Sequence, residues 1–277
     1  MRLEGKVAIV TGAGRGIGRG IVEAFASEGA KLILVSRTLS QVEEAAREAC
    51  EIGTEAVALS VDVANPDDVQ RMADETLSRF GRVDILVNNA AIIHPVGPFW
   101  TNNMRAWADT IEINVIGLAL CCRAVLPTMI EQRDGKIINL SGAGVSGPSE
   151  TLSAYGTSKA AVIRFSETLA AEIRQYNISV NCLAPGQIDT DMLDAATVVS
   201  EDMVDSRFLA QVRRTKSGHG ASLEEAAALA VWLASYESDG LTGRMISATQ
   251  DDWRNLGPRI PEIMTSDLHT LRFVGGQ

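Results

Sequence analysis

The chain has 277 residues, of which 46% are hydrophobic and 22% are charged, and its formal net charge is −10. These values are ordinary for a globular protein and exclude a disordered or collagen-like chain. An acidic surface repels the phosphates of nucleic acid, so no nucleic-acid partner is expected. The sequence has no signal-peptide pattern and no unbroken apolar run of bilayer length, which predicts no membrane association and a cytoplasmic location.

The four cysteines give no indication of a metal site. Cys121 and Cys122 are adjacent, whereas Cys50 and Cys182 lie far from them in the sequence. This spacing matches no zinc-ligand pattern and favours packing roles in a reducing compartment. The sequence therefore predicts no metal cofactor.

Short β-rich runs alternate with longer helical ones along most of the chain. Strands are predicted at residues 6–10, 31–36, 56–61, 84–88, 135–140, 178–183 and 244–248. Helices are predicted at residues 17–27, 39–52 and 153–176, and another begins with Asn65 as its cap and Pro66 in its first turn. The strands are apolar along their whole length, which is typical of parallel strands that are buried on both faces.

This alternation predicts an α/β protein with the Rossmann fold: a doubly wound, mostly parallel sheet of seven strands with helices on both faces. No internal repeat or Pro/Gly-rich linker divides the chain, so a single domain is predicted over residues 1–249. Residues 250–277 form a C-terminal extension with Pro258, Pro261 and few helical signals. The extension covers the pocket, packs across a subunit interface or lies on the surface, and the sequence does not choose among these alternatives.

A glycine-rich segment joins the first strand to the first helix. It reads Thr11-Gly12-Ala13-Gly14-Arg15-Gly16-Ile17-Gly18. Glycines let the backbone turn sharply and approach a pyrophosphate, and the helix N-terminus supplies free N–H groups with a partial positive charge. Between a strand and a helix, this pattern predicts a dinucleotide-binding loop formed by Gly12, Gly14, Arg15, Gly16, Ile17 and Gly18.

The glycine spacing resembles that of the short-chain dehydrogenase/reductase family, and further segments support the resemblance. Asn88-Asn89-Ala90-Ala91 is similar to the family's NNAG segment, with Ala91 in place of the glycine. Asp62-Val63 resembles its adenine-contacting pair, and Pro185-Gly186 resembles its turn beside the nicotinamide. The resemblance extends from about residue 6 to residue 243. It implies cofactor contacts from Asp62, Val63, Asn89, Ala90, Ala91, Tyr155, Lys159, Pro185, Gly186, Ile188 and Thr190.

The end of the second strand indicates which nicotinamide cofactor is bound. NAD-dependent enzymes commonly place an acid there, which binds the hydroxyls of the adenosine ribose. Here Ser36 stands at that place and Arg37 follows it. A guanidinium binds a 2′-phosphate bidentately whereas a carboxylate repels it, and Arg15 in the glycine loop is placed to reach the same phosphate. The sequence therefore favours NADP(H) over NAD(H).

Tyr155 and Lys159 form a YxxxK pair within the helix predicted at residues 153–176. Residues four apart share a helix face, so the phenol and the ammonium are neighbours. A free tyrosine has a pKa of about 10, and a nearby cation is expected to lower the pKa of Tyr155. The resemblance implies that Tyr155 exchanges a proton with the substrate oxygen, that Lys159 also holds the nicotinamide ribose, and that Asn114 holds a water of the proton relay.

The position of the family's catalytic serine departs from the pattern. It falls on Gly142, one residue after Ser141. Three alternatives stay open: Ser141 orients the carbonyl after a small loop adjustment, Ser146 or another loop hydroxyl does so, or Tyr155 alone binds the substrate oxygen. Losing one oriented donor lowers a rate by on the order of 100-fold, so catalysis would survive in a slower form or depend on a polar group of the substrate.

Together these residues predict an NADP(H)-dependent oxidoreductase that interconverts a ketone or aldehyde and an alcohol by hydride transfer. Its small-molecule substrate is expected between loops at residues 92–104, 143–152 and 187–217. The resemblance also implies a homodimer or homotetramer. Two alternatives stay open: a nucleotide-binding sensor or scaffold with weak catalysis, and an epimerase or dehydratase on the same fold.

Overall fold

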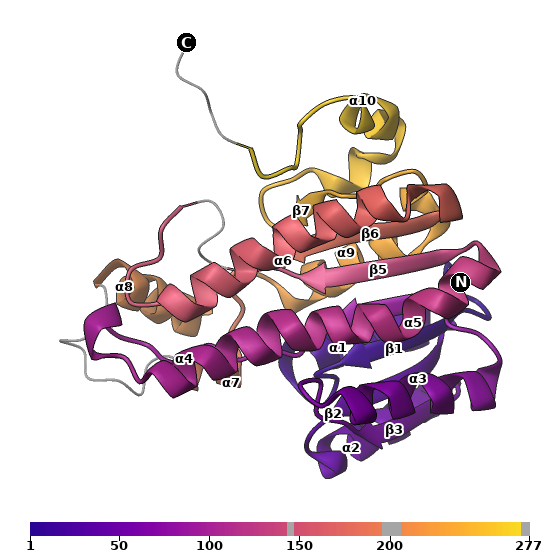
Figure 1. The fold of residues 1–277 in the computed structure, drawn as a ribbon, viewed down its shortest axis with the longest axis horizontal. Coiled ribbons are helices and arrows are strands. Elements are labelled where there is room, and N and C mark those ends of the chain that lie inside the picture. Colours follow the sequence, from indigo (N-terminus) through magenta and orange to yellow (C-terminus); the bar gives the residue numbers. More distant parts are fainter. Residues whose placement is uncertain (143–146, 196–205, 273–277) are drawn as a thin grey trace.

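The computed structural model describes residues 1–142, 147–195 and 206–272, and one parallel sheet forms its centre (Figure 1). The seven strands run in the order β3-β2-β1-β4-β5-β6-β7, and every neighbouring pair is parallel. The strands are β1 Val7–Thr11, β2 Lys31–Ser36, β3 Ala56–Ser60, β4 Ile85–Asn88, β5 Gly135–Leu140, β6 Ile178–Ala184 and β7 Met245–Ser247. Each predicted strand lies within one residue of these bounds at either end.

Helices cover both faces of this sheet (Figure 1). One face packs into a single apolar cluster with α1 Gly16–Ser27, α2 Leu39–Ile52 and α9 Leu223–Ala234. The other face packs against α3 Pro66–Phe80, α5 Leu118–Gln132 and α6 Ser153–Glu172. The shorter helices are α4 Met104–Ile111, α7 Asp191–Ala195, α8 Ser206–Arg214 and α10 Ile260–Met264. This is the predicted doubly wound Rossmann architecture.

Local signals set several helix boundaries. The Asn65 side chain caps α3 by accepting two N–H groups of the first turn, as predicted. Gly81 ends α3 with a φ of 71°, a left-handed conformation that glycine adopts without strain. α6 ends at Glu172 rather than at residue 176, because the 3₁₀ turn Arg174–Tyr176 follows and Asn177 turns the chain at a φ of 59°.

The strand order opens a crevice at the carboxyl edge of the sheet. From β1 the chain moves outward through β2 to β3 and then returns to β4 on the other side of β1. The connections after β1 and β4 therefore leave the sheet in opposite directions, which is where ligands bind in such folds. The glycine loop follows β1 and the segment at residues 88–91 ends β4, so both predicted cofactor segments reach this crevice.

One helical segment has properties that the apolar runs in the sequence did not predict. Met104–Gln132 is continuous through a π-helical turn at Glu112–Gly117, and it is long and apolar enough to cross a membrane. Cys121, Cys122 and Val125 on this segment are buried in the same apolar cluster as α3 and α6. The core helix of a globular domain passes the same test of length and hydropathy, and in this fold the segment packs on the sheet.

The residues after β7 pack onto their own domain. Trp253, Leu256, Ile260 and Ile263 are buried in the same apolar cluster as α1 and α9. Intramolecular packing of this kind was not among the alternatives that the sequence left open. The short helix α10 also forms, despite the few helical signals in this part of the sequence. Proline in its first turn supports it because a helix start needs no N–H there.

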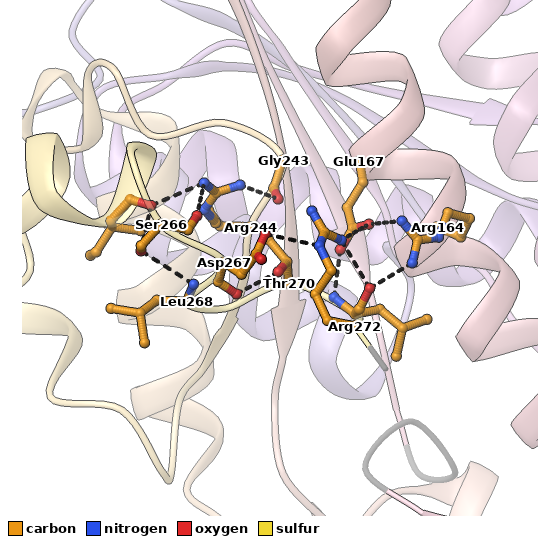
Figure 2. Close-up of polar contacts among 11 residues, drawn as sticks. Arg164, Glu167, Gly243, Arg244, Ser266, Asp267, Leu268, Thr270 and Arg272 are labelled. Carbon is orange, nitrogen blue, oxygen red and sulfur yellow. Dashed lines mark hydrogen bonds and ion pairs between the residues drawn. The ribbon is translucent and has the colours of Figure 1, made fainter. Parts of the chain in front are cut away.

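The described part of the tail around His269 lies beside the edge strand β7 (Figure 2). The N–H of Met245 donates to the carbonyl of His269 at 2.8 Å. The Arg244 guanidinium donates to the carbonyls of Ile263 and Ser266, each at 3.0 Å. Exposed strand edges can pair with other chains, so these contacts cover an edge that would otherwise be open to such pairing.

Glu167 on α6 anchors the same tail. Its carboxylate is 10% exposed, accepts the N–H of Leu271 at 2.7 Å and lies 3.2 Å from the Arg272 guanidinium (Figure 2). Glu167→Ala is expected to lower the free energy of unfolding, measured in urea, by about 1–3 kcal/mol because these donors lose a charged acceptor. Glu262→Ala is the control: its pair with Arg259 is exposed to solvent, so its loss should lower the free energy of unfolding much less. Equal losses in the two variants would contradict the anchoring role.

Candidate active site

A cleft of about 360 Å³ opens where the connections after β1 and β4 diverge. Most of the predicted cofactor residues line it, namely Gly12, Gly14, Arg15, Gly16, Ile17, Ser36, Arg37, Asp62, Val63, Asn89, Ala90, Ala91 and Thr190. The sequence did not single out the other lining residues, which are Val35, Thr38, Gln41, Val61, Ile92, Ile113, Asp189, Asp191 and Met192. The only sequence feature that could have indicated them is their position, because most of them are adjacent in the sequence to predicted contacts.

The glycine loop fits the pyrophosphate of a dinucleotide. A Cβ on Gly18 would lie 2.2 Å from the carbonyl oxygen of Gly12, so only glycine allows this close packing. The Asn89 side chain donates to the carbonyls of Thr11 and Gly12 at 3.0 Å and holds the loop against β4. The cap residue Arg15 makes no capping hydrogen bond, and no acidic residue stands in the first turn of α1. No side chain of the protein therefore caps the N–H groups of that turn, which suits binding of an anion there.

Ser36 and Arg37 line the cleft at the end of β2. The Ser36 hydroxyl donates to the carbonyl of Thr38 at 2.9 Å, so it is engaged locally. The Arg37 side chain is exposed and forms no ion pair with any residue in the described ranges. Asp62 accepts the N–H of Ala64 at 3.0 Å. A guanidinium without a carboxylate partner at the cleft suits an anionic ligand.

Arg15 contacts an acidic residue across the cleft. Its guanidinium lies 2.7 Å from the carboxylate of Asp191, which begins α7. Lys216 pairs with Asp189 and lies 2.6 Å from Asp194 in the same segment. The side chains of Arg15 and Asp191 are 63% and 67% exposed. An ion pair at this exposure contributes little, so Arg15 can exchange Asp191 for a phosphate at little energetic cost.

Tyr155 and Lys159 lie on successive turns of α6, as their spacing predicts. Nζ of Lys159 is 5.6 Å from the centre of the Tyr155 ring and donates to the carbonyl of Leu140, at the end of β5, at 2.8 Å. Burial raises the pKa of Tyr155 to about 12 and lowers the pKa of Lys159 to about 8. The expected lowering of the Tyr155 pKa is therefore wrong here. The loss of water around the phenolate outweighs the cation, which is hydrogen-bonded to a main-chain carbonyl.

The lowered pKa of Lys159 predicts how stability depends on pH. The folded chain releases this proton near pH 8 and the unfolded chain near pH 10.5, so stability rises with pH across this window. Relative to Lys159→Met, the wild-type free energy of unfolding is expected to rise by about 3 kcal/mol between these pH values. Urea denaturation at several pH values checks this. A difference between the two proteins that stays constant with pH would contradict it.

Asn114 lies in the π-helical turn Glu112–Gly117 and is buried. Its Oδ1 accepts the N–H of Ile92 at 2.8 Å, and its Nδ2 donates to the carbonyl of Ile92 and to the Ser158 hydroxyl at 2.9 and 3.0 Å. Asn114 thus ties the segment after β4 to α6, next to Lys159. The water relay that the resemblance implies stays a prediction.

The residues after β5 bear on the alternatives for the missing serine. Ser141 is 2% exposed, and its Oγ lies 3.8 Å from Sδ of Met245 on β7. The structure thus directs the Ser141 hydroxyl toward β7, and it does not bring this hydroxyl to Tyr155. Gly142 instead lies against Tyr155, because a Cβ there would be 2.4 Å from the tyrosine Oη. Ser146 lies outside the described residues.

Six predicted cofactor residues do not line the cleft in the described part of the chain, namely Gly18, Tyr155, Lys159, Pro185, Gly186 and Ile188. Pro185 and Gly186 follow β6, and Gly186 has a φ of 79°. Ile188 is 8% exposed and belongs to the apolar core beside α1 and α9. The Ile188 side chain therefore packs in the core and does not face the cleft. Thr190, two residues later, does reach the cleft.

Tyr155 belongs to a small apolar cluster beside the cleft. Tyr155 is 8% exposed and packs with Ile93, Val96, Leu152, Leu193, Phe208 and Val212. Met192 packs against this cluster and also lines the cleft, so the two are contiguous. The described parts of the predicted substrate loops therefore surround Tyr155 with apolar side chains, while residues 143–146 and 196–205 lie outside the described ranges.

The comparison with known families decides what this combination represents. Residues 6–198 match the short chain dehydrogenase family. The chain belongs to the short-chain dehydrogenase/reductase family. The cleft and the Tyr155–Lys159 pair are therefore parts of an NAD(P)-dependent dehydrogenase or reductase, as predicted.

This short-chain dehydrogenase/reductase resembles known relatives over nearly its whole length. It is 36% identical over 247 residues to the short chain dehydrogenase/reductase astE of Aspergillus oryzae, covering 88% of this chain and 94% of the relative. It is 34% identical over 247 residues to the 3-oxoacyl-(acyl-carrier-protein) reductase FabG of Vibrio cholerae, covering 89% and 96%. The crystal structure of NAD⁺-bound xylitol dehydrogenase matches with a TM-score of 0.81 and 30% identity, covering 89% and 98%.

Proposed function

We propose that this protein is an NADP(H)-dependent carbonyl reductase or alcohol dehydrogenase with Tyr155 as its proton donor or acceptor. The observation that carries the proposal is the position of Tyr155, one turn before Lys159 and in an apolar cluster contiguous with a dinucleotide cleft. The bound nicotinamide supplies or accepts the hydride.

The buried phenol suits a proton donor in carbonyl reduction. Burial raises the pKa of Tyr155 to about 12, so the phenol keeps its proton at neutral pH and donates it to an oxygen that gains negative charge. The Lys159 ammonium then lies near the phenolate that remains and stabilises it. In the reverse direction the phenolate form of Tyr155, beside the Lys159 ammonium, takes the proton of the alcohol. Lys159 also holds the nicotinamide ribose, and Asn114 holds a water that returns protons.

NADP(H) is the proposed cofactor. Gly14 of the glycine loop holds the pyrophosphate together with Gly16 and Ile17 in the first turn of α1, while Asp62 and Val63 contact the adenine. Arg37 has no ion-pair partner in the described ranges, and Arg15 has only an exposed one, so both can bind a 2′-phosphate. The similar xylitol dehydrogenase binds NAD⁺, and these two arginines are what favours NADP(H) in this chain.

The substrate proposed for the site is a small, mainly apolar carbonyl compound or alcohol. The apolar cluster around Tyr155 favours this class because burying a charged group there would be costly.

The catalytic domain would be residues 1–249, with residues 250–277 as its extension. A homodimer or homotetramer is proposed from the family, and Ile116 on the long helical segment is an exposed apolar residue that such contacts would cover. Four free cysteines suit a reducing cytoplasm.

A cofactor-oxidation assay tests the proposal. The protein is mixed with NADPH and a panel of ketones, aldehydes and diketones, and the absorbance of the reduced nicotinamide is followed. We expect at least one panel member to be reduced with loss of NADPH. Tight NADPH binding without oxidation would favour a sensor or scaffold, and product without net change in NADPH would favour an epimerase or dehydratase. Either result overturns the proposal.

A further inference from the structure

Gly142 and the ring of Tyr155 occupy the same corner at the carboxyl end of β5. A Cβ built on Gly142 would lie 2.4 Å from Oη, 3.0 Å from Cζ and 3.1 Å from Cε1 of Tyr155. Ordinary contacts of a Cβ begin at about 3.4 Å. The phenol therefore fills the volume that any side chain at position 142 would need.

Tyr155 cannot give up this volume freely. Its ring also packs in an apolar cluster with neighbours that include Leu152 and Val96. The helix that carries it is also held, because the buried Ser158 hydroxyl donates to the carbonyl of Tyr155 and accepts from Asn114. A Cβ at position 142 would consequently move the hydroxyl-bearing end of the ring.

We propose that Gly142 is a positioning residue, whose missing side chain sets where the Tyr155 hydroxyl meets the reacting oxygen. The inference rests on the proposed function of Tyr155. It implies that a serine side chain at position 142 would displace the phenol from its place. It also implies that the phenol acts as the side-chain donor to the substrate oxygen and that position 142 supplies no second donor. Restoring the family's serine would then impair the enzyme, although the serine supplies a second hydroxyl.

Two substitutions at position 142 separate this inference from a simple loss of a catalytic donor. Alanine or serine requires Cβ and Oη to move apart by about 1 Å, since 2.4 Å must become at least 3.4 Å. A displacement of this size can lower a rate by about 100-fold, so both Gly142→Ala and Gly142→Ser are expected to lose about that much kcat. If Gly142 only marks a lost donor, serine should instead raise kcat by about 100-fold and alanine should leave it unchanged. That pattern would overturn the inference.

The matched control is Gly147→Ala in the same connection, where a Cβ would meet nothing within 4 Å. It should keep wild-type kcat, and all variants should keep the wild-type NADPH dissociation constant. The ultraviolet absorbance of the Tyr155 phenol is titrated with pH and taken as a difference from Tyr155→Phe. This titration reports the position of the phenol independently of enzyme turnover. Displacement from its buried place should lower the pKa of Tyr155 in both position-142 variants, because burial is what raises it. An unchanged titration would refute the inference.

The two proposals fail in different ways. If Tyr155→Phe loses activity while Gly142→Ala keeps it, the positioning role is wrong and the proposed function stands. If Tyr155→Phe retains wild-type activity, the proposed function is wrong, and the titration still decides whether Gly142 sets the place of the phenol.

Discussion

Replacing Tyr155 with phenylalanine is expected to lower kcat by about 100- to 10,000-fold, the usual contribution of a positioned proton donor. The ring would keep its place in the apolar cluster with Leu152 and Phe208, so the fold should survive. The NADPH dissociation constant should change little, because the proposed contacts with the phosphates and the adenine lie in the cleft and are untouched by the substitution. Steady-state kinetics and a fluorescence titration of NADPH measure the two quantities separately.

Two companion variants make the Tyr155 result specific. Tyr236→Phe removes a phenol that is 70% exposed, and it should leave kcat unchanged. Ser141→Ala is expected to have a smaller effect than Tyr155→Phe, since the Ser141 hydroxyl is directed to Met245. A Ser141→Ala variant as inactive as Tyr155→Phe would contradict this ranking, and a Tyr155→Phe variant with wild-type kcat would remove the proton donor from the mechanism.

The double substitution Ser36→Asp with Arg37→Ala is expected to weaken NADPH binding at least about 100-fold more than NADH binding. Only NADPH carries the 2′-phosphate, which loses a guanidinium and gains a neighbouring carboxylate that repels it. The same carboxylate can accept the ribose hydroxyls of NADH. Dissociation constants of both cofactors, measured at one ionic strength, check the difference.

Arg47→Ala is the control for the loss of one positive charge. Arg47 is exposed on α2 and does not line the cleft, so its loss should affect the two cofactors equally and weakly. Should the double variant weaken NADPH and NADH by the same factor, the assignment of Ser36 and Arg37 to the 2′-phosphate would be rejected.

The parts of the fold that local patterns determine could be predicted from the sequence. Strands such as β2, buried along almost its whole length, appear as continuous apolar runs, and the Asn65 cap fixes the start of α3. The glycine loop could be assigned for the same reason, since its strand–turn–helix context is contiguous in the chain. The cleft residues from Gly12 to Ile17 accordingly lie where the sequence predicted them.

Features that depend on contacts distant in the sequence could not be predicted. Ile188 has the right place in the chain for a cofactor contact, but it faces the core. The direction of the Tyr155 pKa depends on burial by residues from several loops. The close approach of Gly142 to Tyr155 requires the register of β5 against α6. Nor does any local pattern around Glu167 indicate that it holds Leu271 of the tail.

A crystal structure of the complex with NADP⁺ tests the central claim most directly. We expect the dinucleotide in the cleft between β1 and β4, with the 2′-phosphate at Arg37 and the nicotinamide ring beside the Tyr155 hydroxyl. A complex in which this hydroxyl points away from the nicotinamide, or a protein that retains neither pyridine nucleotide, would contradict the claim.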